Sequence, residues 1–409
     1  MRTVDEQLAV VLDGVHPLTE LDLTLLDAQG CVLAEDVVAE SPLPPFDNAA
    51  ADGYAVRLED VASASPARPV TLPVVGDVGP GSTSAYSVQS GFTVRMAAGA
   101  PLPAGAEAVV PVGTTDGGIA QVRIDRAPQP GESIRRAGED VVAGQVVLPA
   151  GAHIGSQQVA VLAAVGRGRV RARPRPRVVV VAVGGQYAEA GAAPLGGQVH
   201  DASTPALTAA AIEAGAIAYR VGAVPEDPQT LMGLLEDQLI RADVVVVCGG
   251  GAESGAGALF EALARLGTVS VEQVAMHPGA VQGFGTIGPD ATPIFTVPGD
   301  PVAAYIAFEI FVRPALRRMI GVEATGRPQV RATATAALRG RPGARWFVPA
   351  RLEVKQGSYV ISPAGTAGRT GEHVSALAKA NSLAIVPEST GEVHRGEAAA
   401  VIMLERRHG

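Results

Sequence analysis

The feature that most constrains the fold is an alternation of apolar runs and helical patterns between residues 174 and 324. The run VVVVAVGG at 178–185 precedes one helical pattern, DVVVVCGGG at 243–251 precedes another, and a last helical pattern follows VPGDP at 297–301. Apolar strands that alternate with helices are typical of a parallel sheet covered on both faces, with ligand loops at the carboxyl ends of the strands. We therefore predict a three-layer α/β domain over 174–324.

The flanking segments are rich in short β-prone runs. Residues 42–140 hold VTLPVV, FTVRMA and EAVVPV, separated by turn clusters such as PLPAGA and TTDGG, which predicts a β-rich domain. Short strand-like runs return after Arg327-Pro328, and they predict a C-terminal β-barrel over 325–409. Because 409 residues exceed what one compact core usually holds, the expected fold class is multidomain, α/β plus all-β.

The remaining segments, 1–41 and 141–173, are assigned to a helical and linker domain. Apolar residues at helical spacing predict an amphipathic helix over 3–14, with Thr3 and Gln7 near its N-cap. Further along, arginine stands at every second position from Arg167 to Arg177, so an extended chain would place these side chains on one side. This run favours an extended linker that pairs with acidic neighbours over an anion- or partner-binding stripe.

Composition excludes several classes of protein. A net charge of −9 argues against a nucleic-acid binder, and the two cysteines, Cys31 and Cys248, are too few for a disulfide framework. The N-terminus lacks the pattern of a signal peptide, and no apolar run reaches the roughly 18 to 20 residues that cross a bilayer, so we expect a cytoplasmic protein without membrane insertion. Only two lysines occur, Lys355 and Lys379, so earlier segments must use arginine or histidine as cations.

Two polar segments of the β-rich domain could carry chemistry. The segment PLPPFDNAAADGYAVR holds Asp47, Asn48 and Asp52. Its restricted loop fits either a capped turn or an acid or metal site. The segment IRRAGEDV holds Arg135, Arg136 and Asp140. Arginine beside carboxylate can recognise phosphate or a Mg²⁺-bound anion, or can form a surface ion network.

Three further segments lie in the α/β domain. The loop CGGGAESG holds Gly249, Gly250 and Gly251 after an apolar strand, and it fits a phosphate cradle and a plain tight turn equally well. The segment AMHPGAV holds His277 and Gly279; a lone histidine at a strand end is more often structural than catalytic. In VPGDP, Pro298 and Asp300 form a rigid turn into a helix that Asp300 can cap.

Taken in this order, the motifs PFDNAAADGYAV, RRAGED, the glycine loop, HPG and VPGDPV resemble those of the MoeA family. This family comprises the molybdopterin molybdenumtransferases and includes the gephyrin E domain; the chain is similar to a diverged, gephyrin-like bacterial member. The resemblance implies a homodimer of elongated four-domain subunits, with an α/β domain of the molybdopterin-binding MoaB/MogA type. It also implies that adenylylated molybdopterin and molybdate meet in a cleft, where the nucleotide is hydrolysed with Mg²⁺ and the metal enters the dithiolene.

The resemblance also implies candidate site residues. Asp52 and Asp140 occupy the catalytic and metal-binding positions of the family motifs. The substrate-binding positions of the cleft fall on Asp47, Asn48, Arg135, Arg136, Gln186, Gly249, Gly250, Gly251, His277, Gly279, Pro298 and Asp300. Mg²⁺ is expected only with catalysis, molybdopterin and molybdate are the implied ligands, and no tightly bound cofactor is expected.

The chain departs from the family motifs at four places. Residues 97–101 read AAGAP where the family has MTGAP, so the threonine hydroxyl is lost. Residues 183–187 read VGGQY where the family has TGDEL or TGSEL, so the neutral amide of Gln186 replaces an acid. Residues 248–255 read CGGGAESG where the family has SGGVSxG and a downstream aspartate, so the loop carries Glu253 and has Gly257 near the position of the expected acid. Residues 277–281 read HPGAV where the family has KPGKP, without either lysine. Because the ligands are anions and Mg²⁺ needs oxygen ligands, these losses argue against turnover.

Two principal functions follow from the resemblance and its departures. The leading hypothesis is a gephyrin-like scaffold with a degraded molybdenum-insertion site. It would bind a short peptide tail, such as that of the division protein FtsZ or of a membrane receptor, in a groove near the junction of the α/β and C-terminal β domains. The alternative is an active molybdopterin molybdenumtransferase that inserts molybdate into adenylylated molybdopterin. A third hypothesis is pterin binding without turnover.

Overall fold

The structure, a computed structural model, describes residues 1–83, 86–251, 255, 257–365 and 373–404. Its internal contacts divide the chain into two compact units. The first unit holds residues 1–21, 30–32 and 171–409, and the second holds residues 22–29 and 33–170. Three short strands contain residues of both units: β1 (Leu21–Thr24), β2 (Val32–Leu33) and β12 (Arg169–Arg173).

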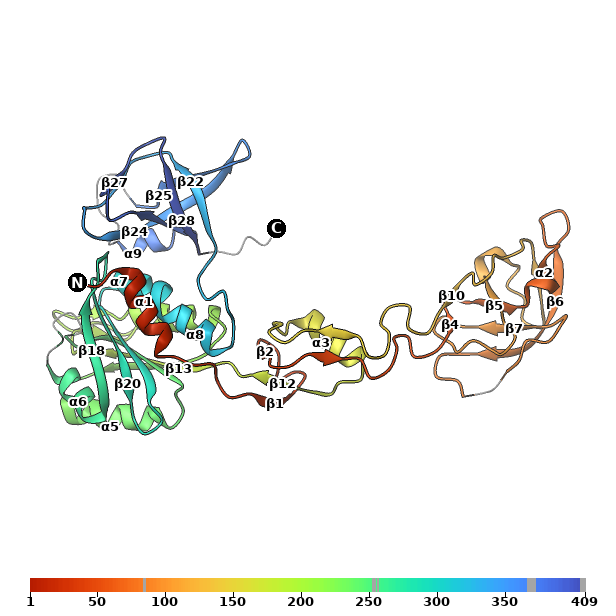
Figure 1. The fold of residues 1–409 in the computed structure, drawn as a ribbon, viewed down its shortest axis with the longest axis horizontal. Helices are drawn as coiled ribbons and strands as arrows, with labels where there is room; N and C mark the ends of the chain where they lie inside the picture. Colours follow the sequence, from red (N-terminus) through yellow and green to blue (C-terminus); the bar gives the residue numbers. More distant parts are fainter. Residues whose placement is uncertain (84–85, 252–254, 256, 366–372, 405–409) are drawn as a thin grey trace. The chain divides into compact units, whose positions relative to one another are not determined.

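A mixed sheet with the strand order β16-β13-β17-β21-β20-β18 lies in the first unit (Figure 1). In chain order its strands are β13 (Arg177–Val183), β16 (Ile217–Val224), β17 (Val244–Gly249), β18 (Gly267–Gln273), β20 (Val281–Ile287) and β21 (Thr292–Val297). β13 is parallel to β16 and β17, and β17 is parallel to β21, as predicted. β20 is antiparallel to both β21 and β18. The predicted parallel arrangement does not extend to this edge, because the connections there are too short for crossovers.

Helices cover both faces of this sheet (Figure 1). One core cluster receives apolar side chains from α1 (Val4–Asp13), α4 (Ser203–Glu213), α7 (Pro301–Ala307) and α8 (Arg313–Met319). The other receives them from α5 (Pro228–Leu239) and α6 (Ala258–Leu266). Along β13, Val178 and Val180 join the first cluster while Val179 and Val181 join the second. The run VVVV shows no polar alternation because both of its sides are buried.

The C-terminal part of the first unit is a closed β-barrel. Its strands are β22 (Gln329–Ala334), β24 (Arg345–Lys355), β25 (Ser358–Pro363), β26 (Ser382–Val386) and β28 (Ala398–Met403). The order β24-β25-β22-β28-β26 closes because β26 also pairs with β24. The short strand β19 (Met276–His277) adds to β24 in parallel. Small elements of this unit are β14 (Tyr187–Ala188), β15 (Val199–His200), β23 (Leu338–Arg339), β27 (Glu392–Val393) and α9 (Val374–Leu377).

The second unit is β-rich, with the sheet order β8-β5-β7-β6-β9. These strands are β5 (Gly53–Val56), β6 (Val70–Val78), β7 (Thr93–Met96), β8 (Ala108–Pro111) and β9 (Gln121–Ile124). Two small ladders pair β4 (Asn48–Ala49) with β10 (Ile134–Arg135) and β3 (Val37–Val38) with β11 (Val146–Leu148). The helices are α2 (Leu58–Val61) and α3 (Ser156–Ala164). The predicted fold class is thereby confirmed, while the limits of the four predicted domains stay predictions.

The N-terminal helix is confirmed as α1. The Thr3 side chain accepts a hydrogen bond from the amide of Glu6, and the Glu6 side chain accepts one from the amide of Thr3, which forms a capping box. Gln7 is instead buried and accepts from Arg2 at 3.0 Å. Among the described residues, the structure contains no helix with the length and apolar character needed to span a bilayer.

The alternating arginines of residues 167–177 all have oxygen partners. The partners are Glu40 for Arg167, Asp22 for Arg169, Glu20 for Arg171 and Arg173, the carbonyls of Gly215 and Ala216 for Arg175, and Asp243 for Arg177. Exposed pairs of this kind contribute about 0 to 1 kcal/mol each. Their existence supports the predicted linker with acidic neighbours over a ligand-binding stripe.

Candidate functional site

In the first unit, the glycine loop after β17 packs against the end of β13. The amide of Gly250 donates to the carbonyl of Val183 at 2.9 Å, and a Cβ at Gly249 would lie 2.7 Å from that carbonyl oxygen. Gly249, Gly250 and Gly251 all have positive φ. Close approach and left-handed backbone therefore require glycine here, although the same backbone can form an anion-binding concavity. Glu253 lies outside the described residues.

The turn after β13 is tied to the PGDP turn after β21. The Gln186 side chain covers Gly184, where a Cβ would clash with the Gln186 amide. Tyr187 Oη donates to the carbonyl of Gly299 at 3.4 Å, and Ser203 Oγ donates to the same carbonyl at 3.0 Å. Three loops far apart in the sequence thus meet at the carboxyl ends of the parallel strands, as predicted for ligand loops.

The PGDP turn also contacts the glycine loop and caps a helix. A Cβ at Gly299 would lie 3.5 Å from the Cα of Gly249. Asp300 Oδ1 accepts from the amides of Val302 and Ala303 at 3.0 and 2.9 Å, so the predicted cap of α7 is confirmed. Through these bonds the position of the turn is fixed relative to α7.

The HPG segment lies against the same turn. A Cβ at Gly279 would lie 3.5 Å from Cγ of Pro298. His277 stacks on Trp346 of the barrel, with ring centroids 3.7 Å apart and ring planes inclined by 34°. This contact gives His277 a structural role at the junction of the α/β part and the barrel, the role that the sequence pattern favours.

A buried acid near this edge was missed by the sequence analysis. Asp201 is 3% exposed, accepts from the amide of Thr204 at 3.0 Å and from the Thr204 hydroxyl, and lies 3.7 Å from Arg220. Arg220 also pairs with Glu189 at 3.0 Å. Burial raises the pKa of the neighbouring Cys248 thiol, and the charge of Asp201 raises it further. Asp201 occupies a helix-capping position, but no local sequence pattern indicates that its side chain is buried.

In the second unit, Asp47 joins the two predicted polar segments. Its Oδ1 accepts from the amide of Ala137 at 2.8 Å, and its Oδ2 accepts from Arg136 Nη1 at 2.6 Å. The bond to the Ala137 amide, and then the pair with Arg136, hold the pKa of the Asp47 carboxyl below its ordinary value. Asn48 and Arg135 are strand partners in the β4–β10 ladder. The geometry matches the surface ion network, one of the two interpretations of this segment.

Asp52 is oriented by a main-chain group. Its Oδ1 accepts from the amide of Ala98 at 2.7 Å, and the amide of Gly99 donates to the carbonyl of Ala49 at 2.8 Å. Ala98 stands where the resembled motif has threonine. The bond to Asp52 uses only the amide, so it does not require the threonine side chain.

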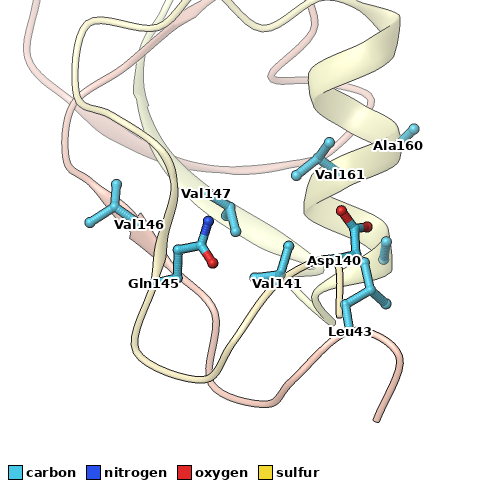
Figure 2. Close-up of a pocket in the computed structure, with 9 residues that line it drawn as sticks. Leu43, Asp140, Val141, Gln145, Val146, Val147, Ala160 and Val161 are labelled. Carbon is cyan, nitrogen blue, oxygen red and sulfur yellow. The ribbon is translucent and has the colours of Figure 1, made fainter. Parts of the chain in front are cut away.

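Asp140 lies at a pocket of about 450 Å³ in the second unit (Figure 2). Most of the lining is apolar: Leu43, Val141, Val146, Val147, Ala160, Val161 and Ala164, with Gln145 and Asp140 as the polar members. Figure 2 shows the Asp140 carboxylate between Leu43 and Val161 of α3. The amide of Asp140 donates to the carbonyl of Leu43 at 3.1 Å, which ties RRAGED to the proline-rich segment.

The structure thus gathers the predicted residues within each unit. Gln186, Gly249, Pro298 and Gly279 lie along one edge in the first unit, and Asp47 contacts RRAGED in the second. Among the described residues, no group of three or more His, Cys, Asp or Glu side chains could hold a metal ion. The roles of Asp52 and Asp140 as a catalytic and metal-binding pair stay predictions.

Three family models match the chain in the order of its parts. They are the MoeA N-terminal region (domain I and II) at residues 2–166, a probable molybdopterin binding domain at 179–318, and the MoeA C-terminal region (domain IV) at 331–404. The α/β part with its loops at the strand ends therefore falls in the class of probable molybdopterin-binding domains.

Relatives and solved structures agree with this class. Molybdopterin molybdenumtransferase 1 of Mycobacterium tuberculosis is 42% identical over 336 residues, which cover 78% of this chain and 79% of the relative. Molybdopterin molybdenumtransferase 2 of the same organism is 38% identical over 328 residues, covering 79% and 80%. A structure of the molybdopterin biosynthesis MoeA protein of Pyrococcus horikoshii matches with a TM-score of 0.79 at 28% identity, covering 99% of both chains. The chain belongs to the MoeA family.

These findings bear on the two principal hypotheses. The resemblance inferred from the motifs is confirmed. The relatives carry the name of the transferase, which supports the alternative hypothesis. The scaffold with an FtsZ-type peptide partner receives no support from the comparisons.

Proposed function

We propose that the chain is a molybdopterin molybdenumtransferase that inserts molybdate into adenylylated molybdopterin. The observation that carries the proposal is the meeting of four loops, at 184–187, 249–251, 277–279 and 298–300, on one edge of the sheet. Ligands of such sheets bind at the carboxyl ends of the strands. Curated relatives at 42% and 38% identity bear the transferase name.

Main-chain groups can supply much of the anion recognition that the missing lysines would have supplied. The backbone of the glycine loop at 249–251 is left-handed. The Gly250 amide donates to the Val183 carbonyl, but loops of this kind can direct other main-chain N–H groups toward an anion. Such fixed dipoles need no reorganisation as negative charge develops in the transition state.

Asp52 and Asp140 are the carboxylates that would hold Mg²⁺ in this proposal. Both are exposed carboxylates of the second unit, and Mg²⁺ in phosphate chemistry commonly takes one or two carboxylates, with water and substrate phosphate completing its shell. The ion would supply charge neutralisation at the phosphate. The bond from the Ala98 amide orients the Asp52 carboxylate before any ligand binds.

The test is a direct assay of the purified chain. It is supplied with adenylylated molybdopterin, molybdate and Mg²⁺, and release of AMP and formation of molybdenum cofactor are measured together. Both products should form in equal amounts, and chelation of Mg²⁺ should stop both. AMP release no faster than in a reaction without protein refutes the proposal.

A pair of variants localises the activity. Asp52→Asn keeps an oxygen for the Ala98 amide but loses the charge, so activity should fall by about 10²-fold or more. Asp125→Asn is the matched control, because Asp125 is a carboxylate of the same unit that pairs with Arg123 at 3.3 Å and belongs to neither motif. Equal activity of the two variants would remove Asp52 from the proposed site.

The homodimer is likewise our proposal. Val146 and Val161, which line the pocket of Figure 2, are 46% and 36% exposed, and exposed apolar patches often mark protein contacts. Sedimentation equilibrium should give twice the chain mass of 41.5 kDa. A mass equal to one chain at micromolar concentration would refute the dimer.

A further inference from the structure

We propose that Trp346 of the β-barrel is a positioning residue that holds the HPG turn at the candidate site. Trp346 is the only tryptophan of the sequence and lies on β24. The packing of Trp346 does not depend on the function proposed above, whereas the expected effect of Trp346 on turnover rests on that function. The barrel would then help to build the site without touching the reacting groups.

The indole ring is held by packing on two sides. Its centroid lies 3.7 Å from that of His277, and a Cβ at Gly340 would lie 2.8 Å from Trp346 Cγ. Trp346 is 8% exposed, and its Nε1 is buried without a hydrogen-bond partner among the described residues. Buried indoles usually donate a hydrogen bond. Here the ring is positioned by packing against His277, Gly340 and the apolar cluster of the barrel.

The backbone brings the same two residues into register. In the parallel pairing of β19 with β24, His277 lies opposite Trp346 and Met276 lies opposite Arg345. The amide of Arg345 donates to the carbonyl of Ala275 at 2.8 Å. A strand of two residues makes few ladder bonds, so the stacked rings add contact area where the backbone offers little.

Contacts then lead from His277 to the glycine loop. Gly279, two residues on, packs against Pro298, and its carbonyl accepts from Gln282 Nε2 at 2.6 Å. The next residue after Pro298 is Gly299, which approaches Gly249. Because closely packed groups transmit displacements, a shift of the His277 ring would move the HPG and PGDP turns. A misplacement of about 1 Å at a site can lower its rate by roughly 10²-fold.

The experiment compares variants that disturb the stack with one that disturbs only the barrel core. Gly340→Ala inserts a methyl group beneath the indole, and His277→Ala removes its stacking partner. Leu352→Ala is the control, because Leu352 is 4% exposed on the same strand and in the same barrel cluster. We expect kcat to fall by about tenfold or more in the first two variants, with a smaller change in KM. In the control, the melting temperature should fall while kcat stays within about twofold.

Trp346 emission gives a second readout that needs no turnover. Molybdopterin is titrated anaerobically into the chain, and we expect a saturable change in emission that His277→Ala abolishes. Suppose that the wild type turns over. If kcat of Gly340→Ala and of His277→Ala is then no lower than that of Leu352→Ala, the inference is overturned while the proposed transferase function stands. A saturable emission change without turnover refutes the transferase and supports the coupling. Absence of both responses overturns both.

Discussion

Replacement of Asp300 distinguishes a helix cap from a substrate contact. Its Oδ1 accepts from two amides of α7 at 3.0 and 2.9 Å, and α7 continues through the π-helical turn Phe308–Val312 into α8. Loss of an N-cap residue costs about 0.5 to 2 kcal/mol, and loss of a negative charge at a helix N-terminus costs about 0.3 to 1 kcal/mol. Asp300→Ala should therefore destabilise the first unit by roughly 1 to 2 kcal/mol.

The assay is thermal unfolding followed by Trp346 emission, because the sole tryptophan of the sequence lies in the first unit. For units of this size, 1 kcal/mol shifts the melting temperature by about 2 to 4 °C. Asp300→Ala should thus lower it by about 2 to 8 °C. Asp300→Ser offers a hydroxyl to the same amides, so its melting temperature should stay within about 2 °C of the wild type.

The serine variant also decides the role of the carboxylate. If Asp300 acts only as a cap, Asp300→Ser retains transferase activity together with stability. An alanine variant as stable as the wild type would refute the energetic argument. A serine variant with native stability and about tenfold lower kcat would show that the carboxylate contacts substrate or metal.

Three further predictions concern groups whose environment the structure fixes. The fully buried Glu309 carboxylate pairs with Arg327 at 2.6 and 2.8 Å, so Glu309→Leu should lower the free energy of unfolding by about 3 to 5 kcal/mol in a urea titration; an unchanged midpoint would contradict this. Because the folded pKa of Asp47 is below its ordinary value of 3.8, its contribution to stability is present above that value and is lost as pH falls through the lowered pKa. Asp47→Asn should reduce this loss of stability in thermal unfolding curves recorded from pH 6 to 2. A loss of stability as large as in the wild type would show that other acids cause it. Cys31 and Cys248 are buried, and burial raises the pKa of the latter, so Ellman's reagent at pH 8 should react only after unfolding; rapid reaction of the native chain would contradict the burial.

The parts of the fold that depend on local pattern could be predicted from the sequence. The run VVVV in β13 predicts a strand buried on both faces, and the PGDP motif predicts the cap by Asp300. Thr3 likewise caps α1, since its partner lies three residues away. In each case the information sits within a few residues of the element that it specifies.

The parts that depend on tertiary contact could not be predicted. β18 and β20 are antiparallel because of connection length, not because their residues differ from those of parallel strands. Asp201 lies 3.7 Å from Arg220, which belongs to β16, a strand that follows α4 in the chain. The partner of His277 is Trp346, nearly seventy residues later, and no periodicity links the two. Such pairings arise only when the sheet and the barrel pack together.

The difference between side-chain and main-chain contacts bears on the scaffold hypothesis, which rested on the missing lysines and acids. That inference counted side chains that differ from the family motifs, whereas several contacts of the candidate residues, within each unit, use main-chain groups. Asp52 binds the amide of Ala98, which any residue except proline would offer. Gly249 and Gly250 are required by the approach of Val183, and the Gly299 carbonyl is bound by Tyr187 and Ser203. A substitution that leaves the backbone in place removes one charge but preserves these main-chain contacts, so motif loss alone is weak evidence that a member of this family has lost its reaction.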